Sequence, residues 1–478
     1  MKLILLLISV FVAIKSQDAL RTIEYRSIDG LKITADLYEV NKAYPTIIAF
    51  HQSGSSRGEY RQIAPELTKE GFNVLAVDLR WGKRDRWNSI ENETAVRFGT
   101  PAILERYKEG RRDEVWPTVD KAYDDMLASY DWLYVNDYTG KMLIMGSSFS
   151  SILVFKMAAE RDISAVLSYS PAEYRPNDTT LVRSWVKDLD IPVYFVAAED
   201  EGEMVQKVYT AMRNPQKVYY QAAKGKHGAS ILFEDPRNLR NLTDFLKRFK
   251  SPQEVSFKTK DDIEIFADWY AINESVNTPV ILAFNQGGSN VGSEYAPFVD
   301  RLLAAGFNVL AVDQRRGGNR FGGKNRTVDK LGDRQFTYCE AYPDLVAAMD
   351  FLDQLKYKGK RIAWGSSFSA ALVVQLAANY PDKIAGVLAF SPASGEPMAG
   401  CEPKLYLDQL KIPALFLRPS RELQLDFVRD QFELFQAKNF KTYVARNAVH
   451  ASSMLNRKRV QGDIEENWAV VLQFLESL

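Results

Sequence analysis

The chain carries the same stretch of sequence twice. The pentapeptide GSSFS occurs at 146–150 and again at 365–369, and the octapeptide GFNVLAVD at 71–78 returns unchanged at 306–313. The matches keep their order over a period of about 220 residues, the length of a domain and far longer than a solenoid repeat. We therefore expect two copies of one fold, with the chemistry of that fold present twice.

Two further features set the expected boundaries. The leading MKLILLLISVFVAIKSQ has a basic start, an apolar middle and a polar exit, which is typical of a cleaved signal peptide, with an uncleaved anchor as the alternative. Near Pro252 an amphipathic helix ends and a new strand begins. The sequence predicts a signal peptide at 1–17, domain 1 at 18–250 and domain 2 at 251–478. We expect an exported protein, extracellular or periplasmic, with no membrane span after signal cleavage.

Apolar runs alternate with longer amphipathic segments in each copy. In the first copy TIIAF, FNVLAVD, KMLIM, SAVLSYS and PVYFVAA are typical of buried strands. Continuous apolar strands separated by helices indicate a mostly parallel sheet covered on both faces. The leading RTIEYRS and LKITADLY alternate apolar and polar residues, which favours an antiparallel edge. The predicted fold class is α/β, in two tandem domains, each a mostly parallel sheet with helices on both faces.

Charge and cysteine content exclude several classes of protein. Lys+Arg and Asp+Glu both number 61, which removes the electrostatic case for a nucleic-acid partner. The two cysteines, Cys339 and Cys401, are too few for a disulfide scaffold, and a single bridge and two free thiols remain equally open. Five Asn-X-Ser/Thr sequons would allow a glycoprotein in a glycosylating host, at Asn92, Asn177, Asn241, Asn273 and Asn325.

Each GSSFS lies between an apolar strand and a helix. In this context it resembles the nucleophile elbow, G-x-S-x-G, of the α/β-hydrolase superfamily, in which the central serine sits on a sharp strand-to-helix turn. The resemblance covers nearly all of the mature chain, in two tandem units, and implies Ser148 and Ser367 as nucleophiles. Ser150 and Ser369 stand where the family has its second glycine, a departure that a small residue permits.

A serine nucleophile needs a base, which in this family is a histidine near the end of the domain. His227 and His450 occupy the same place in the two copies and are the predicted bases. His51 has Asn285 as its counterpart, so we expect it to brace its loop by hydrogen bonding. The three histidines lie far apart in sequence, with no close-spaced ligand pair, so no metal and no cofactor are expected.

The resemblance places the acid in the loop after the strand that follows an Ile-Pro turn. Glu201 aligns with Glu422, whereas Asp200 aligns with Arg421, so Glu201 and Glu422 are the predicted acids and Asp200 is the reserve. A merely solvated acidic turn is the alternative. Two weaker candidates follow the preceding strand, Glu173 and Glu396.

The resemblance also implies an oxyanion hole made of two backbone N–H groups in each domain. One comes from the residue after the nucleophile, and the other from the turn that contains HQSGSS or NQGGSN. The predicted donors are Ser53 and Phe149 in domain 1, and Gly287 and Phe368 in domain 2. The Asp and Arg of LAVDLRWG and LAVDQRRGG resemble structural residues of the family.

Together these features predict an exported serine hydrolase with Ser-Glu-His triads, acting on small-molecule carboxylic esters through an acyl-enzyme. One alternative is a non-catalytic protein that binds a ligand or partner; another is a serine peptidase or acyltransferase with the same triad. Both domains are expected to work, the first better, because the turn RPSRE crowds Glu422 with arginine. The first copy has extra residues at 97–121, which form either a lid or a surface insertion.

Overall fold

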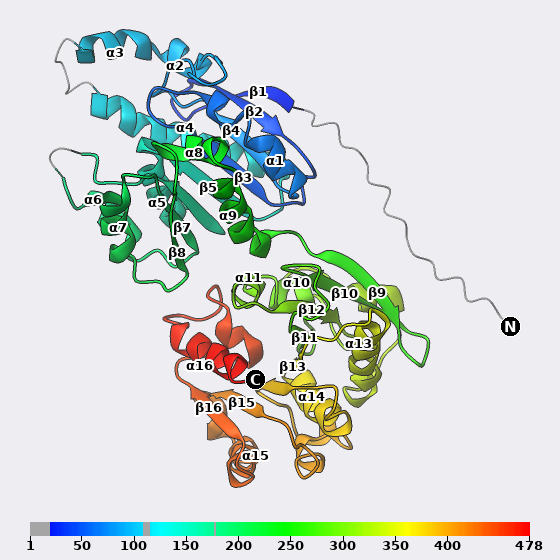
Figure 1. Cartoon of the computed structure of the whole chain (residues 1–478). Helices are drawn as coiled ribbons and strands as arrows, with labels where there is room; N and C mark the ends of the chain where they lie inside the picture. The colour runs from blue at the N-terminus through cyan, green and yellow to red at the C-terminus, as the bar shows by residue number, and fades with distance from the viewer. Residues whose placement is uncertain (1–19, 109–114, 176–177) are drawn as a thin grey trace. The chain divides into compact units, whose positions relative to one another are not determined.

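The computed structural model of the chain describes residues 20–108, 115–175 and 178–478 (Figure 1). The predicted signal peptide at 1–17 and the sequon at Asn177 lie outside the described residues. The chain divides into two compact units with the boundary between Ser251 and Pro252. We call them unit 1 and unit 2 and describe each by itself.

Unit 1 is built on an eight-stranded sheet with the order β1-β2-β4-β3-β5-β6-β7-β8. β2 pairs antiparallel with β1 and with β4, and all the other pairs are parallel. The strands are β1 (Leu20–Arg26), β2 (Lys32–Tyr38), β3 (Thr46–Phe50), β4 (Asn73–Val77), β5 (Met142–Ser147), β6 (Ala165–Tyr169), β7 (Val193–Ala197) and β8 (Lys217–Gln221).

Unit 2 repeats this topology strand for strand, in the order β9-β10-β12-β11-β13-β14-β15-β16, with the antiparallel pairs again at β9 and β10. Its strands are β9 (Gln253–Lys258), β10 (Glu264–Tyr270), β11 (Val280–Phe284), β12 (Asn308–Asp313), β13 (Arg361–Ser366), β14 (Gly386–Phe390), β15 (Ala414–Pro419) and β16 (Lys441–Ala445). The predicted fold class, two α/β units with mostly parallel sheets, is confirmed.

From the third strand of each unit onward, helices lie between successive strands (Figure 1). The α-helices of unit 1 are α1 (Ala64–Lys69), α2 (Glu93–Phe98), α3 (Thr100–Lys108), α4 (Val115–Val135), α5 (Phe149–Glu160), α6 (Leu181–Val186), α7 (Gly202–Ala211), α8 (Ile231–Glu234) and α9 (Pro236–Leu246). Those of unit 2 are α10 (Val291–Glu294), α11 (Val299–Ala304), α12 (Arg326–Leu331), α13 (Tyr342–Gln354), α14 (Phe368–Asn379), α15 (Asp426–Ala437) and α16 (Glu465–Glu476).

Short 3₁₀ helices complete the loops at the strand ends. They are η1 (Arg57–Tyr60), η3 (Gly228–Ser230), η4 (Lys247–Phe249), η5 (Cys339–Ala341), η6 (Glu396–Met398), η7 (Pro403–Leu405), η8 (Ser420–Gln424) and η9 (Ala451–Leu455). Within the ranges given above for the described chain, no helix combines the length and the hydrophobicity needed to cross a bilayer.

Each sheet has an apolar layer on both faces. In β3, Ile48 and Phe50 belong to one buried cluster, whereas Ile47 and Ala49 belong to a second. Alternation along a strand sends successive side chains to opposite faces, so the two clusters are the two sides of the sheet. The central strands are therefore fixed from both sides, and the loops at their carboxyl ends start from rigid positions.

A buried arginine ties the loop after the fourth strand to the first hairpin and to a long helix. Arg80 makes ion pairs with Asp125 of α4 and Asp29 of the β1–β2 turn. In unit 2, Arg315 pairs in the same way with Asp344 and Asp261. The structural role predicted for these arginines is confirmed, and it holds the post-strand loop in the same register in both units.

Two of the five sequons are structural caps rather than surface sites. Asn92 is fully buried, its Oδ1 accepts from the Ala95 N–H at the start of α2, and its Nδ2 donates to the carbonyls of Ser55 and Leu79. Asn325 is buried and caps α12 in the same manner. Because a glycan cannot be attached to a buried side-chain amide in the folded protein, these two sequons are not accessible acceptors. Two exposed sequon asparagines remain, Asn241 and Asn273.

Candidate active sites

The backbone at Ser148 and Ser367 has the strained geometry of a sharp strand-to-helix turn. Their φ, ψ angles are 59°, −117° and 62°, −115°, a region that non-glycine residues rarely adopt. Two residues earlier, a Cβ on Gly146 would lie 2.5 Å from the Ser150 carbonyl oxygen, and Gly365 is equally crowded. The first position of each GSSFS therefore requires glycine, and the turn holds the central serine at the end of β5 or β13.

The last serine of the motif fastens this turn to the neighbouring strand. Ser150 Oγ donates to the carbonyl of Phe50, the last residue of β3, at 2.8 Å and accepts from the Ser147 N–H at 2.8 Å. Ser369 makes the equivalent pair of bonds with Phe284 and Ser366. The serine hydroxyl thus makes two hydrogen bonds to the backbone that a glycine at this position could not make.

In unit 1 the three predicted triad residues form one chain of hydrogen bonds. His227 Nε2 lies 2.7 Å from Ser148 Oγ, and His227 Nδ1 is hydrogen-bonded to Glu201 Oε1. With Nδ1–H donating to the carboxylate, Nε2 is left as the acceptor for the serine hydroxyl. Ser148 is buried, whereas the His227 side chain is partly exposed. This arrangement can move a proton from the serine to the imidazole.

Glu201 is held in place from a second side. Its Oε2 accepts from the Ser170 hydroxyl and from the Ala198 N–H, the latter at 3.2 Å. Burial on its own would raise the pKa of Glu201, but the hydrogen bonds from His227 and Ser170 outweigh it and the pKa is lowered. The carboxyl group is therefore ionised at neutral pH and can stabilise a charged imidazole.

The other acid candidates make no hydrogen bond to His227 or His450 among the described residues. Asp200 is exposed beside Glu201. Glu173 accepts from the N–H groups of Val182 and Arg183 and so caps α6. Glu396 is exposed in η6. Of the acids considered in unit 1, the structure brings only Glu201 into hydrogen-bond contact with His227 among the described residues.

Unit 2 assembles only part of the same arrangement. His450 Nδ1 lies 2.6 Å from Glu422 Oε1, but among the described residues no hydrogen bond joins His450 to Ser367. Glu422 Oε2 accepts from the buried Arg418 at 2.9 Å, in place of the backbone N–H found in unit 1. Burial would raise the pKa of Glu422, but His450 and Arg418 lower it overall. The exposed Arg421 is not the arginine that crowds this carboxylate.

The backbone around the histidine accounts for this difference. His227 has φ −172°, whereas His450 has φ −56°, so the two imidazoles leave the chain in different directions. The following residue has a positive φ in both units, 67° at Gly228 and 60° at Ala451. Glycine adopts this conformation without strain, whereas alanine does not. Unit 2 therefore has alanine at a position of the histidine loop where glycine would be less strained.

The predicted oxyanion donors of unit 1 lie at two loop ends. Phe149 is the first residue of α5, so its N–H has no acceptor within the helix. Ser53 is exposed, and its Oγ accepts from Trp81 Nε1 at 3.0 Å, which fixes the turn that carries the second N–H. Trp81 thus bonds the side chain of Ser53 and not its backbone N–H.

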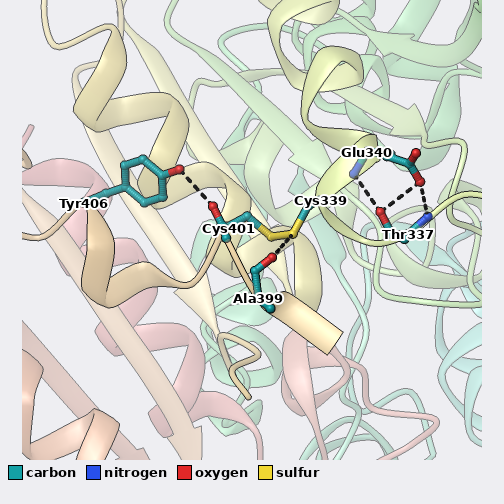
Figure 2. The surroundings of a disulfide bond; sticks show 7 residues. Thr337, Cys339, Glu340, Ala399, Cys401 and Tyr406 are labelled. Atoms are coloured by element: carbon teal, nitrogen blue, oxygen red, sulfur yellow. Dashed lines mark hydrogen bonds between the residues drawn. A yellow bond between two sulfur atoms is a disulfide. The ribbon is translucent and has the colours of Figure 1, made fainter. Parts of the chain in front are cut away.

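An aromatic ring lies against both predicted donors of unit 2. Tyr338 stacks on Phe368, with ring centroids 4.8 Å apart, and its hydroxyl would lie 3.1 Å from a Cβ placed on Gly287. Cys339 follows this tyrosine and is joined to Cys401 by a disulfide (Figure 2). The bridge therefore fixes the segment that covers the donors, and it resolves the alternative left open by the sequence.

His51 and Asn285 brace the turn after the third strand, as predicted. His51 Nδ1 lies 2.8 Å from the Gln52 carbonyl, and its Nε2 accepts from the Leu79 N–H at 3.0 Å. Asn285 donates to the Gln286 carbonyl and accepts from the Gln314 N–H. Burial lowers the pKa of His51 to about 4, so this ring is a neutral structural group.

A buried glutamate behind the elbow did not emerge from the sequence. Glu59 accepts from the Gln52 N–H at 2.8 Å and from the Ser147 hydroxyl at 2.7 Å, and Ser147 Oγ accepts from the Ala229 N–H. It links the elbow, the oxyanion turn and the histidine loop. The signal was present in the shared letters EY, because Glu294 stands at the same place in unit 2 and accepts from the Gln286 N–H.

The described part of the chain contains no set of side chains arranged to bind a metal ion. No group of three or more His, Cys, Asp or Glu side chains is placed to hold an ion there.

Known families and structures resemble parts of this chain. The family described as serine aminopeptidase, S33, matches residues 278–472. No curated protein matches the chain. An esterase of Pyrococcus furiosus, Pf2001, is 20% identical over 47% of this chain and 92% of its own, with a TM-score of 0.36. An acylaminoacyl peptidase of Pyrococcus horikoshii is 16% identical over 48% of this chain and 42% of its own, with a TM-score of 0.37. A dienelactone hydrolase of Anabaena variabilis is 19% identical over 48% and 96%, with a TM-score of 0.34.

Proposed function

The chain has the α/β-hydrolase fold, in two tandem units, and from this premise we propose that it is a serine hydrolase that cleaves carboxylic esters through an acyl-enzyme. The superfamily resemblance expected from the two elbows is confirmed at the level of the fold. The observation that supports the activity is the unbroken chain of hydrogen bonds from Glu201 through His227 to Ser148.

The reaction follows from the roles of these three residues. His227 Nε2 takes the proton of Ser148 as its Oγ bonds to the ester carbonyl carbon, and the carbonyl oxygen becomes an oxyanion. The N–H groups of Ser53 and Phe149 stabilise that charge. When the bond to the alcohol breaks, His227 returns the proton to the leaving oxygen. Water then repeats the sequence on the acyl-enzyme and releases the acid, and Glu201 steadies the imidazolium in both steps.

Unit 1 is proposed as the main site for neutral esters. Its imidazole already bonds the serine, whereas in the part of the chain that the structure describes His450 bonds Glu422 and not Ser367. Unit 2 retains Ser367, Glu422 and His450, so we propose that it acts once a ligand has drawn the histidine loop into place.

A peptidase is the second candidate, because the family that matches residues 278–472 is described as a serine aminopeptidase. The same triad can cleave an ester or an amide, so the leaving group decides between the two. Comparing 4-nitrophenyl butyrate with amino-acid 4-nitroanilides separates them. We expect a kcat/KM higher for the ester; a higher value for the anilides would make the peptidase the better account.

Ser148→Ala tests the proposed activity most simply. We expect the rate on 4-nitrophenyl butyrate to fall by about three orders of magnitude or more, and the double variant with Ser367→Ala to remove what remains. Ser184→Ala, an exposed serine of α6, is the matched control and should keep the wild-type rate. A double variant as active as the wild type would refute the proposal.

We also propose that the protein is exported. Two features support this, the pattern of residues 1–17 and the disulfide between Cys339 and Cys401, since disulfides persist mainly in oxidising compartments. Fractionation of the native host tests it: the protein should be found outside the cytoplasm and shortened at its N-terminus, and a full-length cytoplasmic protein would contradict it.

A further inference from the structure

The loop after the fourth strand differs between the units at two positions. It reads LRW at 79–81 in unit 1 and QRR at 314–316 in unit 2. The central arginines, Arg80 and Arg315, make equivalent ion pairs, so the two loops are in the same register. Unit 2 therefore has polar side chains on both sides of the shared arginine, where unit 1 has apolar ones.

The first of these polar side chains, Gln314, makes no side-chain hydrogen bond within the described residues. Its side chain is fully buried, and neither Oε1 nor Nε2 has a hydrogen-bond partner among the described residues. Its counterpart Leu79 packs in the core of unit 1 together with Trp81 and Phe149. Burying an amide with no partner is unfavourable, so this position suits a polar partner that the described residues do not supply.

Arg316 also has a buried polar atom without a hydrogen-bond partner among the described residues. Its guanidinium lies over the ring of Tyr338 at 5.0 Å, and its buried Nε has no hydrogen-bond partner within the described residues. Trp81, which stands there in unit 1, instead donates to Ser53. Arg316 brings a positive charge two residues from Gln314, and a guanidinium is complementary to a planar anion, which arginine binds through two parallel hydrogen bonds.

Two successive ring contacts connect this pair to the residue that follows the candidate nucleophile of unit 2. Arg316 covers Tyr338, Tyr338 stacks on Phe368, and Phe368 follows Ser367 directly. Tyr338 precedes Cys339, which is joined to Cys401 by the disulfide (Figure 2). The bond restrains the backbone next to this tyrosine.

We propose that unit 2 binds a ligand that bears a free carboxylate, held by the guanidinium of Arg316 and the amide of Gln314 beside Ser367. Unit 1, with Trp81 and Leu79 at these positions, takes neutral ligands. The two units would then handle acyl groups of different charge. The proposed binding of a carboxylate does not depend on hydrolysis. The prediction that Ser367 cleaves an ester of such a ligand rests on the proposed function.

Equilibrium binding tests the carboxylate site without any turnover. The full chain with Ser148→Ala and Ser367→Ala is titrated calorimetrically with N-phenylglutaramic acid and with butyranilide, which has a similar acyl chain but no charge. We expect the acid to bind at least about tenfold more tightly and Arg316→Gln to weaken it by about 10- to 100-fold. The exposed Arg320→Gln is the matched control and should change nothing. Equal affinities, or no effect of Arg316→Gln, would overturn the proposal.

Gln314→Leu, which restores the residue of unit 1, provides a second variant. It removes an unpaired buried amide, so we expect an unchanged or higher Tm together with weaker binding of the acid. Unchanged binding would exclude Gln314 from the site.

A kinetic experiment separates this inference from the proposed function. The Ser148→Ala chain is assayed with mono-4-nitrophenyl glutarate and with 4-nitrophenyl butyrate, and we expect a preference for the anionic ester that Arg316→Gln abolishes. If the acid binds through Arg316 but neither ester is cleaved, hydrolysis by unit 2 fails and the carboxylate site stands. If both esters are cleaved equally, the carboxylate site fails and the hydrolase stands.

Discussion

His51 and Asn285 show two different side chains in one structural role. Each donates to the next residue's carbonyl and accepts the N–H of a residue after the fourth strand. We therefore expect His51→Asn to change the free energy of unfolding by less than about 1 kcal/mol and to keep ester hydrolysis, because Asn repeats both bonds. His51→Leu, which leaves the buried Leu79 N–H without its acceptor, should cost about 1–3 kcal/mol. Urea unfolding and initial rates measure both; loss of activity in His51→Asn with stability intact would instead make His51 a catalytic group.

Glu59 gives unit 1 a pH dependence of stability. Burial raises its pKa to about 7, against hydrogen bonds from Gln52 and Ser147 that lower it. Because the folded pKa lies above the unfolded value near 4.5, the folded state holds more protons between these two values. Its contribution to the free energy of unfolding is therefore complete below about pH 4.5 and is lost as pH rises toward 7.

We expect Glu59→Gln, which cannot ionise, to flatten this slope by up to about 3 kcal/mol between pH 4.5 and 8. Glu203→Gln, at an exposed helical position, is the control and should leave the slope as it is. Unfolding curves across this pH range give the comparison, and an identical slope in Glu59→Gln and wild type would contradict the prediction.

At the scale of elements, α2 begins where Asn92 caps it. The side chain satisfies the N–H of Ala95 and also bonds the loops after β3 and β4. Asn92→Ala should lower the free energy of unfolding by about 1–3 kcal/mol, more than an ordinary cap, because the Leu79 carbonyl also loses its donor. Asn241→Ala, at an exposed sequon, should stay within about 0.5 kcal/mol. Chemical denaturation measures both; equal effects would show that Asn92 has no structural role.

The elements themselves were predictable, because apolar strands, the order of the repeats and the strand-turn-helix context are all local in sequence. The elbows and their glycines follow from that context. The caps at Asn92 and Asn325 could not be predicted in this way, because a sequon has the same letters whether its asparagine is buried or exposed. The missing contact of Ser367 with His450 could not be predicted either, because the sequence shows alanine in place of Gly228 but not the different backbone φ of His450 itself.

At the scale of the whole molecule, the disulfide belongs to unit 2 alone. It closes a loop of 62 residues between the start of η5 and the segment after η6. Replacing Cys339 and Cys401 by serine should lower the free energy of unfolding of unit 2 by about 4 kcal/mol, chiefly because the unfolded chain gains freedom. Calorimetry of the full chain measures the change, and an unaltered unfolding profile would show that the bridge adds no stability.

Duplication made the site easier to predict than a single copy would have. Comparing the copies separated Glu201 from Asp200 and both candidate bases from His51, because a residue required by the fold recurs at the same position. The same comparison shows where the units diverge, at Leu79 against Gln314, Trp81 against Arg316 and Gly228 against Ala451. The two units thus share one fold and differ in the loops that would meet a ligand.

Covalent labelling is the most direct test of the claim that unit 1 presents an activated serine. The full chain is treated with a fluorophosphonate, digested, and mapped by mass spectrometry beside the His227→Ala variant. The account predicts an adduct on the peptide that contains Ser148 in the wild type, and its loss in His227→Ala. Ser148 left unmodified in the folded wild type, or labelled equally in the variant, would contradict it.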